Sequence, residues 1–337
     1  MEYINYFWRY AIAYAISIGG LWGTMEMYSY FKNDELRNLL GDYWWTLYLT
    51  PLPFIFAFIL RDFYRRTPVR GWEALINNHL SDVKVYGSVQ EEPRVEIVDN
   101  YIMSADEIDE ATKNRPEIND LHAMCSDEPV LIQRPVAFHV KTLDFASLKV
   151  LRKRDKHEYV LSASVVVVCR KRKMLILHHR SKDSATYPDS LHTLGGAYQP
   201  NVDGPSLVKT GKREVLEEIG ASVLAEEVPP MVLALESTTR FLQLVILGAN
   251  ITGRQCDNLS SNWEAEGIVK IPFDDLRRRL IESIRIKDSS GKEREIGWVP
   301  SGKAHVLSWL AHGAPGAGLK PSFNGLSPEA LFNDIVG

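Results

Sequence analysis

The chain has 337 residues, 45% of them hydrophobic, and a formal net charge of −4. This length is sufficient for more than one compact unit, and the small negative charge gives no sign of affinity for a nucleic-acid polymer. The three cysteines, Cys125, Cys169 and Cys256, are far apart and odd in number, so we expect neither a disulfide framework nor a zinc site.

Two long apolar segments lie within the first 66 residues. Tyr10–Met25 contains no charged side chain, and Tyr43–Leu60 is a second uncharged run of 18 residues. A helix that spans a bilayer needs roughly 20 mostly apolar residues, with a lower limit of about 17. Both segments meet this requirement, so residues 1–66 are predicted to form a transmembrane hairpin with spans at about 8–28 and 43–62.

The residues around these segments favour a membrane over a buried core. Five of the eight tryptophans occur in the first 72 residues, and tryptophan is enriched at bilayer interfaces. A cleaved signal peptide is the alternative for the first segment, but the residues before it include Glu2 and only one arginine, and a second apolar run follows at once. Arginines crowd the exit of the second span, so both termini and everything after Arg66 should be cytoplasmic.

Residues 67–153 show the weakest pattern. Trp72–Leu80 and Asp106–Lys113 have helical spacing, and Leu131–His139 has the character of a strand. These features do not distinguish a stalk that connects the hairpin to the next domain from a subdomain that covers the sheet of that domain. Both interpretations remain open.

From residue 154 onward the periodicity becomes that of an α/β domain. Runs of apolar, β-branched residues predict strands, and a stripe of leucine and isoleucine predicts a helix. The predicted strands are Tyr159–Cys169, Met174–His178, Met231–Thr238 and Phe241–Ala249, and the predicted helices are Phe273–Ile284 and one that begins at Ser327. His178 and His179 are adjacent in a strand and point to opposite faces, which makes them poor candidates for a shared metal.

The most informative segment is Arg213–Ala221 (REVLEEIGA). Glu214, Glu217 and Glu218 occupy positions i, i+3 and i+4, which are neighbours on a helical surface. Like charges at this spacing repel, and a divalent cation such as Mg2+ would turn the repulsion into binding because it prefers carboxylate oxygens. Gly220 then ends the helix. The plainer interpretation is a solvated acidic helix.

Together with Gly195-Gly196 upstream, this segment resembles the Nudix box, the loop-helix signature of hydrolases that cleave nucleoside diphosphates linked to another moiety. The helical half matches the family pattern at every fixed position. The loop half departs from it, because Pro205 stands eight residues before Arg213, where the family has a glutamate. The segment from Gly196 to Arg213 is also about three residues longer than the usual box. The loop is therefore remodelled.

The resemblance implies a Nudix-like α/β domain over residues 154–337, with a mixed sheet between helices and with Mg2+ as the cofactor. The metal ligands it assigns are Glu214, Glu217 and Glu218, and the catalytic residues, if the protein is a hydrolase, are Arg213, Glu217 and Glu218. The predicted ligand-binding residues are Gly195, Gly196 and Arg180.

The order of the predicted hairpin and the predicted Nudix-like domain along the chain indicates a narrower family. A membrane hairpin followed by a degenerate Nudix domain resembles the SMODS-associated Nudix effectors of bacterial cyclic-oligonucleotide antiphage systems (CBASS). This resemblance implies a multi-pass protein of the bacterial inner membrane whose cytoplasmic domain senses a cyclic di- or trinucleotide. It further implies that several copies of the chain gather and disrupt the membrane lipid, since two spans alone enclose no pore.

A membrane-anchored Nudix hydrolase that acts on a nucleoside diphosphate derivative is the alternative. The three box glutamates favour it, and Glu264 or Glu266 is available to replace the ligand that is missing at Pro205. The missing metal ligand at Pro205 favours the cyclic-nucleotide sensor instead. A phosphate-binding fold that loses one metal ligand can lose its hydrolytic activity and still keep its binding cleft. A structural scaffold without a ligand has no positive support in the sequence.

Overall fold

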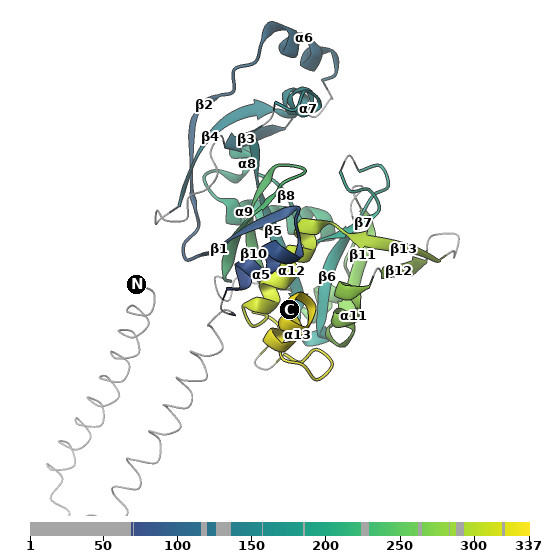
Figure 1. Ribbon diagram of the computed structural model, residues 1–337. Helices are drawn as coiled ribbons and strands as arrows, with labels where there is room; N and C mark the ends of the chain where they lie inside the picture. The colour runs from purple at the N-terminus through teal and green to yellow at the C-terminus, as the bar shows by residue number, and fades with distance from the viewer. Residues whose placement is uncertain are drawn as a thin grey trace, which may run out of the picture. The chain divides into compact units, whose positions relative to one another are not determined.

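The computed structural model describes residues 69, 71–115, 120–125, 136–156, 158–184, 186–223, 229–261, 265–282, 284–287, 293–318 and 321–337. Both predicted membrane spans lie outside these residues, so the hairpin stays a prediction. Within the described ranges, no helix is long and apolar enough to cross a bilayer. The described residues belong to one compact unit, Pro68–Gly337 (Figure 1).

A mixed sheet organises this unit, as predicted. Its central strand, β5 (Tyr159–Cys169), runs parallel to β10 and antiparallel to β3, β6 and β8. The main path of neighbouring strands is β1-β9-β10-β5-β6-β7-β13-β12, and β11 pairs with β6. The other strands are β1 (Val83–Val89), β2 (Arg94–Asn100), β3 (Leu121–Cys125), β4 (Ala137–Asp144), β6 (Met174–Arg180), β7 (Ser190–His192), β8 (Leu194–Ala197), β9 (Met231–Glu236), β10 (Phe241–Asn250), β11 (Ala265–Pro272), β12 (Ile284–Lys287) and β13 (Glu293–Trp298).

Helices cover both faces of the sheet because its central strand is apolar on both sides. Leu161 and Val165 pack toward α9, whereas Val166 and Val168 pack toward α12. The helices are α5 (Trp72–His79), α6 (Ala105–Lys113), α7 (Phe145–Lys153), α8 (Pro200–Asp203), α9 (Leu207–Ile219), α10 (Gly253–Asp257), α11 (Leu276–Ile281), α12 (Pro300–Ala311) and α13 (Pro328–Val336), with short 3-10 turns at Arg170–Arg172 and Phe273–Asp275.

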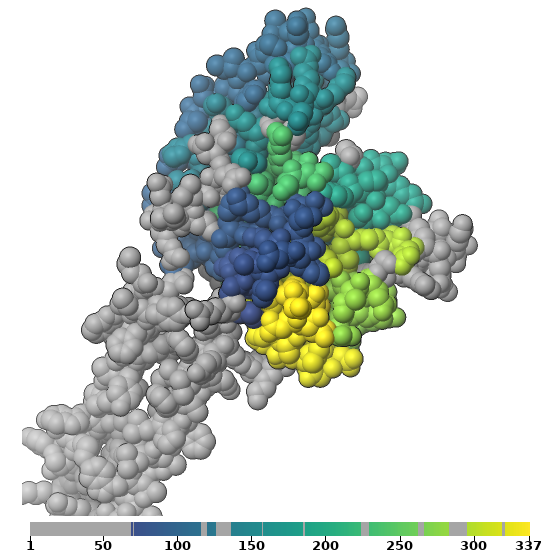
Figure 2. Space-filling view, in the orientation of Figure 1, coloured from purple at the N-terminus to yellow at the C-terminus, as the bar shows by residue number. Residues whose placement is uncertain are grey.

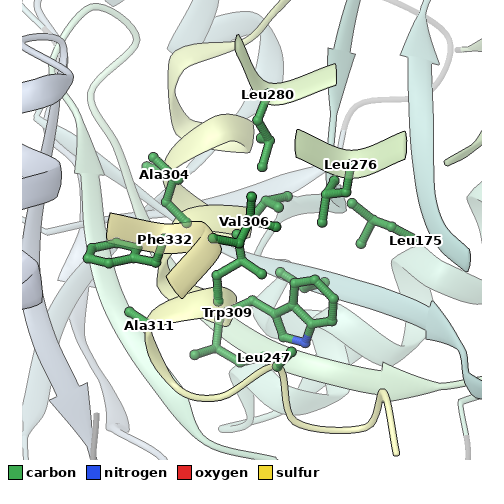
Figure 3. Packing of buried hydrophobic residues seen from close by; sticks show 14 of the residues in the cluster. Leu175, Leu247, Leu276, Leu280, Ala304, Val306, Trp309, Ala311 and Phe332 are labelled. Atoms are coloured by element: carbon green, nitrogen blue, oxygen red, sulfur yellow. The ribbon is translucent and has the colours of Figure 1, made fainter. Parts of the chain in front are cut away.

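The core on the α12 side joins segments that are far apart in the sequence. Figure 3 shows Val306 and Trp309 of α12 between Leu175 and Leu247 of the strands, with Phe332 of α13 nearby. In Figure 2, residues at the start of the described chain lie against those at its end. This core fixes α12 against the sheet, and with it the polar side chains at its first turns.

The segment 67–153 contributes strands to this same sheet. β1 pairs with β9, and β3 pairs with β5 through Met124 and Val160. β4 joins β3, and β2 joins β4 in parallel. Helices α6 and α7 pack on each other at this end of the molecule (Figure 1). The segment thus extends the sheet, a role that the sequence pattern did not indicate.

One predicted helix is shorter than expected. The pattern predicted a helix over Phe273–Ile284, but α11 ends at Ile281 and Ile284 begins β12. Ile284 pairs with Ile296 of β13, so a long-range strand pairing overrides the local helical spacing. The predicted terminal helix is confirmed, and the Ser327 hydroxyl accepts a hydrogen bond from the Ala330 amide at its start.

Candidate functional site

The predicted box helix is α9, and local chemistry sets both of its ends. The Ser206 hydroxyl accepts a hydrogen bond from the Lys209 amide at the start of α9. Gly220 ends the helix with a φ of 66°, in the left-handed region that favours glycine. Val215 and Ile219 are buried against the sheet. The carboxylates between them are therefore held beside strand β8.

The two predicted loop glycines lie in β8, directly against the box glutamates. The Gly195 amide donates a hydrogen bond of 3.0 Å to Glu218. A Cβ at Gly196 would fall within the Glu214 carboxylate, and one at Gly195 would collide with the backbone of β5 at Ala163. Both positions therefore require glycine, and β8 and α9 lie in direct contact at these residues.

Arg213 is the ionic centre of the site. Its guanidinium lies 2.9 Å from Asp203, 2.6 Å from Glu214 and 3.0 Å from Glu217. It also donates to the Ala197 carbonyl, at 3.2 Å. Burial alone would lower the pKa of Arg213, but the hydrogen bond to Asp203 and the neighbouring carboxylates raise it well above its usual value. Arg213 is thus firmly cationic and holds three carboxylates together.

Asp203 is a site residue that the sequence analysis missed. It lies ten residues before Arg213, at the end of the short helix α8, and is 3% exposed. It accepts hydrogen bonds from Arg213 and from the Thr210 hydroxyl. Pro205 occupies the family's carboxylate position, but a carboxylate does lie against the box arginine, from two residues earlier in the chain. The insertion in the loop shifted it out of the expected register.

The three box glutamates lie in different environments. Glu214 is buried, and burial raises the pKa of its carboxyl group to about 8, assisted by the charges of Glu218 and Glu217 and opposed by Arg213. The side chain of Glu217 is 53% exposed. Glu218 is buried, with one oxygen 3.0 Å from His178 Nδ1 and the other bound to the Gly195 amide. Only Glu217 faces water freely.

These side chains, as arranged, do not fit a bound Mg2+. Within the part of the chain that the structure describes, no group of three His, Cys, Asp or Glu side chains is placed to hold a metal ion. Both oxygens of Glu218 already accept hydrogen bonds, and Glu214 and Glu217 share the Arg213 guanidinium. A metal bound by all three glutamates would therefore compete with Arg213 and with the hydrogen-bond partners of Glu218.

The remaining predicted residues lie apart from this ionic cluster. Arg180 donates to the Thr186 carbonyl at 3.1 Å. Glu266 is exposed on β11, and Glu264 lies outside the described residues. His178 and His179 do point apart, as predicted: His178 contacts Glu218, and His179 contacts Asp189 at 2.7 Å. The adjacent histidines therefore share no partner.

A second polar cluster lies under the first turns of α12, and the sequence analysis did not identify it. Thr193 contacts His305 Nδ1 at 2.8 Å, and Ser301 contacts His192 Nε2 at 3.1 Å. The rings of His192 and His305 are 5.8 Å apart. The cluster also contains Glu236 of β9 and Gln243 of β10, on the face of these strands that α12 covers.

Several polar atoms of this cluster are buried without a partner. Among the described residues, no hydrogen bond reaches His305 Nε2, Gln243 Oε1 or Glu236 Oε1. Leaving such atoms unsatisfied costs about 1–3 kcal/mol each. Burial lowers the pKa of His305 to about 3 and raises that of Glu236.

Comparison with solved structures finds partial matches. The chain is similar to a MutT protein from Methanosarcina mazei Go1, with 19% identity, a TM-score of 0.29, and coverage of 36% of this chain and 80% of that one. It is also similar to a NUDIX hydrolase from Nitrosomonas europaea (15% identity, TM-score 0.32, 46% of this chain, 90% of that chain) and to an Ap4A hydrolase from C. elegans (13%, 0.27, 35% and 83%). No family model matches the chain, and no curated protein matches it.

Proposed function

We propose that this protein is a membrane effector of a cyclic-oligonucleotide (CBASS) antiphage system, in which the Nudix-like domain senses a cyclic di- or trinucleotide. The two predicted spans of residues 1–66 anchor it in the bacterial inner membrane. Binding of the nucleotide then drives copies of the chain to assemble and breach that membrane. Two observations support this function: the resemblance of the sequence to the SMODS-associated Nudix effectors, and the contacts among the charged residues of the box.

The contacts of Arg213 are the observation that carries this proposal. In the described structure the guanidinium contacts Asp203, Glu214 and Glu217, so each of these carboxyl groups already has a cationic partner within the protein. Breaking a buried ion pair costs about 3–5 kcal/mol, which a metal would have to repay before it could act in hydrolysis. A domain that binds its ligand and releases it unchanged fits this arrangement better than a hydrolase.

The polar cluster under α12 supports recognition of a nucleotide. Its unpartnered atoms come from β9, β10 and α12, and they are a carboxyl oxygen of Glu236, an amide oxygen of Gln243 and Nε2 of His305. A nucleobase edge presents donors and acceptors of the same kind. Ligand hydrogen bonds would remove the cost of leaving these atoms buried and unpaired. We infer that a base of the cyclic nucleotide binds to this cluster.

The alternative remains a membrane-anchored hydrolase of a nucleoside diphosphate derivative. Retention of Glu214, Glu217 and Glu218 favours it, and so does Asp203, which replaces the carboxylate missing at position 205. In that case a substrate with its own metal would rearrange the ion pairs of Arg213. The sensor would release its nucleotide unchanged, whereas the hydrolase would release cleaved products, and chromatography distinguishes the two.

Incubation of the full chain in detergent with cyclic di- and trinucleotides is expected to return them bound but unchanged, as chromatography of the released ligand would show. His305→Leu and Gln243→Leu should each weaken binding by about tenfold, the effect of one lost hydrogen bond to a buried group. Ser308→Ala is the matched control, because Ser308 lies on the same helix and its hydroxyl donates to the Ala304 carbonyl. Metal-dependent turnover of nucleoside diphosphate derivatives, abolished by Glu217→Gln and by Glu218→Gln, would establish the hydrolase instead.

Dye leakage from liposomes tests the membrane half of the proposal. The reconstituted full chain should release an entrapped dye only when a cyclic nucleotide is added, because a ligand shifts a conformational equilibrium through its different affinities for the two states. His305→Leu should shift the leakage curve to higher ligand concentration by the same factor as it weakens binding. Leakage without any ligand would show that the Nudix-like domain is not the gate, and saturating ligand without leakage would refute the effector role.

A further inference from the structure

A cavity of about 350 Å³ lies among α5, α11, β13 and the first turn of α12. None of its lining residues belongs to α9 or β8, so it is separate from the box. Its volume is within the range of about 300–1,000 Å³ that is typical of small-molecule pockets. Leu80, Leu280, Trp298 and Pro300 give it an apolar lining.

Lys303 supplies a positive charge to this cavity. The side chain lines the wall and is half-buried, and burial lowers the pKa of its ammonium group. Among the described residues, no carboxylate pairs with that ammonium and no hydrogen bond to it is formed. Lys303 also lies near the start of α12, whose first turn contains no acidic residue. A partly desolvated cation at the start of a helix would be stabilised by a directly bound anion.

Trp298 offers this cavity an aromatic ring in a fixed orientation. The indole Nε1 of Trp298 donates a hydrogen bond of 2.8 Å to the Arg279 carbonyl, so the ring orientation is set before any ligand arrives. Stacking of a planar base on an aromatic side chain contributes about 1–3 kcal/mol. Asp82 and Glu282 are exposed lining residues whose charges oppose any anion, so an anionic ligand must contact Lys303 directly. The cavity therefore suits a small ligand with one anionic group and one planar ring.

We propose that this cavity is a second ligand site, for a nucleoside monophosphate or a similar small organic phosphate, with the phosphate at Lys303 and the ring against Trp298. The site does not depend on the box or on the role in the membrane, so its failure would leave the proposed function untouched. The phosphate and the ring would contribute separately to the binding affinity. Lys303→Met tests the phosphate contact, and Trp298→Ala tests the ring contact.

Equilibrium dialysis of the full chain in detergent with AMP, adenosine and inorganic phosphate tests the proposal. AMP is expected to bind saturably. Lys303→Met should weaken it by about tenfold or more, since a charge-assisted hydrogen bond contributes about 1.5–3 kcal/mol. Trp298→Ala should weaken the binding of AMP but leave the binding of inorganic phosphate unchanged. Lys212→Met, on the exposed surface of α9, is the matched control and should bind as the unmodified protein does.

Competitive acetylation with acetic anhydride locates the bound ligand without any substitution. AMP should protect Lys303 from acetylation and leave Lys212 reactive, whereas thermal unfolding confirms that the Lys303→Met protein is folded. Adenosine that binds as tightly as AMP, or unchanged AMP affinity in a folded Lys303→Met protein, would overturn the assignment of the phosphate to Lys303. Absence of saturable AMP binding, or acetylation of Lys303 that AMP does not reduce, would overturn the site itself.

Discussion

Arg213→Ala is expected to lower the free energy of unfolding by about 3–5 kcal/mol, the cost of removing one partner of a buried ion pair. Asp203 is 3% exposed and pairs with this guanidinium at 2.9 Å, so the variant would leave a buried carboxylate without its cation. Without it, the carboxylates at i, i+3 and i+4 of α9 also repel one another. Thermal or denaturant unfolding of the full chain, followed by circular dichroism in the presence of EDTA, measures the loss.

Lys212→Ala is the control for this variant. Lys212 precedes Arg213 on α9 but is exposed, so its removal should change the free energy of unfolding by less than about 0.5 kcal/mol. Adding Mg2+ to the Arg213→Ala protein gives a second readout. Recovery of stability would show that the freed carboxylates can hold a cation, in support of the hydrolase. An Arg213→Ala protein as stable as Lys212→Ala would show that the ion pairs of Arg213 do not stabilise the box.

Local signals were sufficient to place the box helix. The spacing of Glu214, Glu217 and Glu218 predicted a helix, and Gly220 predicted its end, because both signals operate within a few residues. The mixed sheet followed from the apolar strands Tyr159–Cys169 and Phe241–Ala249 and from the resemblance. Features that depend on neighbours in sequence were therefore predicted correctly.

Features that depend on contacts between distant segments were not predicted from the sequence. Helical spacing gave three carboxylates on neighbouring positions, but could not show that Arg213 and Asp203 would neutralise them. The insertion moved Asp203 out of the expected register, so counting residues indicated Pro205 instead. The pairing of Ile284 with Ile296 likewise shortened the predicted helix. Only the folded chain brings these residues together.

The sequence contains a pattern that indicates the polar cluster under α12, but the sequence analysis did not use it. Ser162 and Ser164 interrupt an otherwise apolar strand, and Gln243 interrupts another, so polar residues recur on one face at the strand period of two. Such a pattern in a buried strand indicates a polar interior. It does not show which helix covers that face, and the pairing of Thr193 with His305 spans more than one hundred residues. The pattern alone could not have assembled this cluster.

Acidification should destabilise the protein steeply through its buried histidines. Burial lowers the pKa of His305 to about 3 and that of His122 to about 4, and holds that of His192 well below 6.5. The unfolded chain takes up these protons below about pH 6.5 and the folded chain does not, so stability is complete above that pH and is lost as the pH falls. Glu214 acts oppositely, because its raised pKa of about 8 makes the folded state gain stability as the pH falls from about 8 toward 4.5.

The stability of the full chain in EDTA should therefore be greatest near pH 6.5 and fall below it by about 3 kcal/mol per pH unit. This is the balance, at about 1.4 kcal/mol each, of four buried histidines, His312 with its pKa of about 4 included, against the carboxyl groups of Glu214 and Glu236, whose pKa values are raised. His305→Gln should reduce this slope by about 1.4 kcal/mol per pH unit, since glutamine takes up no proton. His139→Gln, at an exposed histidine, should leave it unchanged. Urea unfolding at intervals between pH 4.5 and 8 measures both slopes. A constant free energy of unfolding across this range, or an unchanged slope in His305→Gln, would show that these histidines are not held neutral in the folded protein, and the interior under α12 would then be open to water.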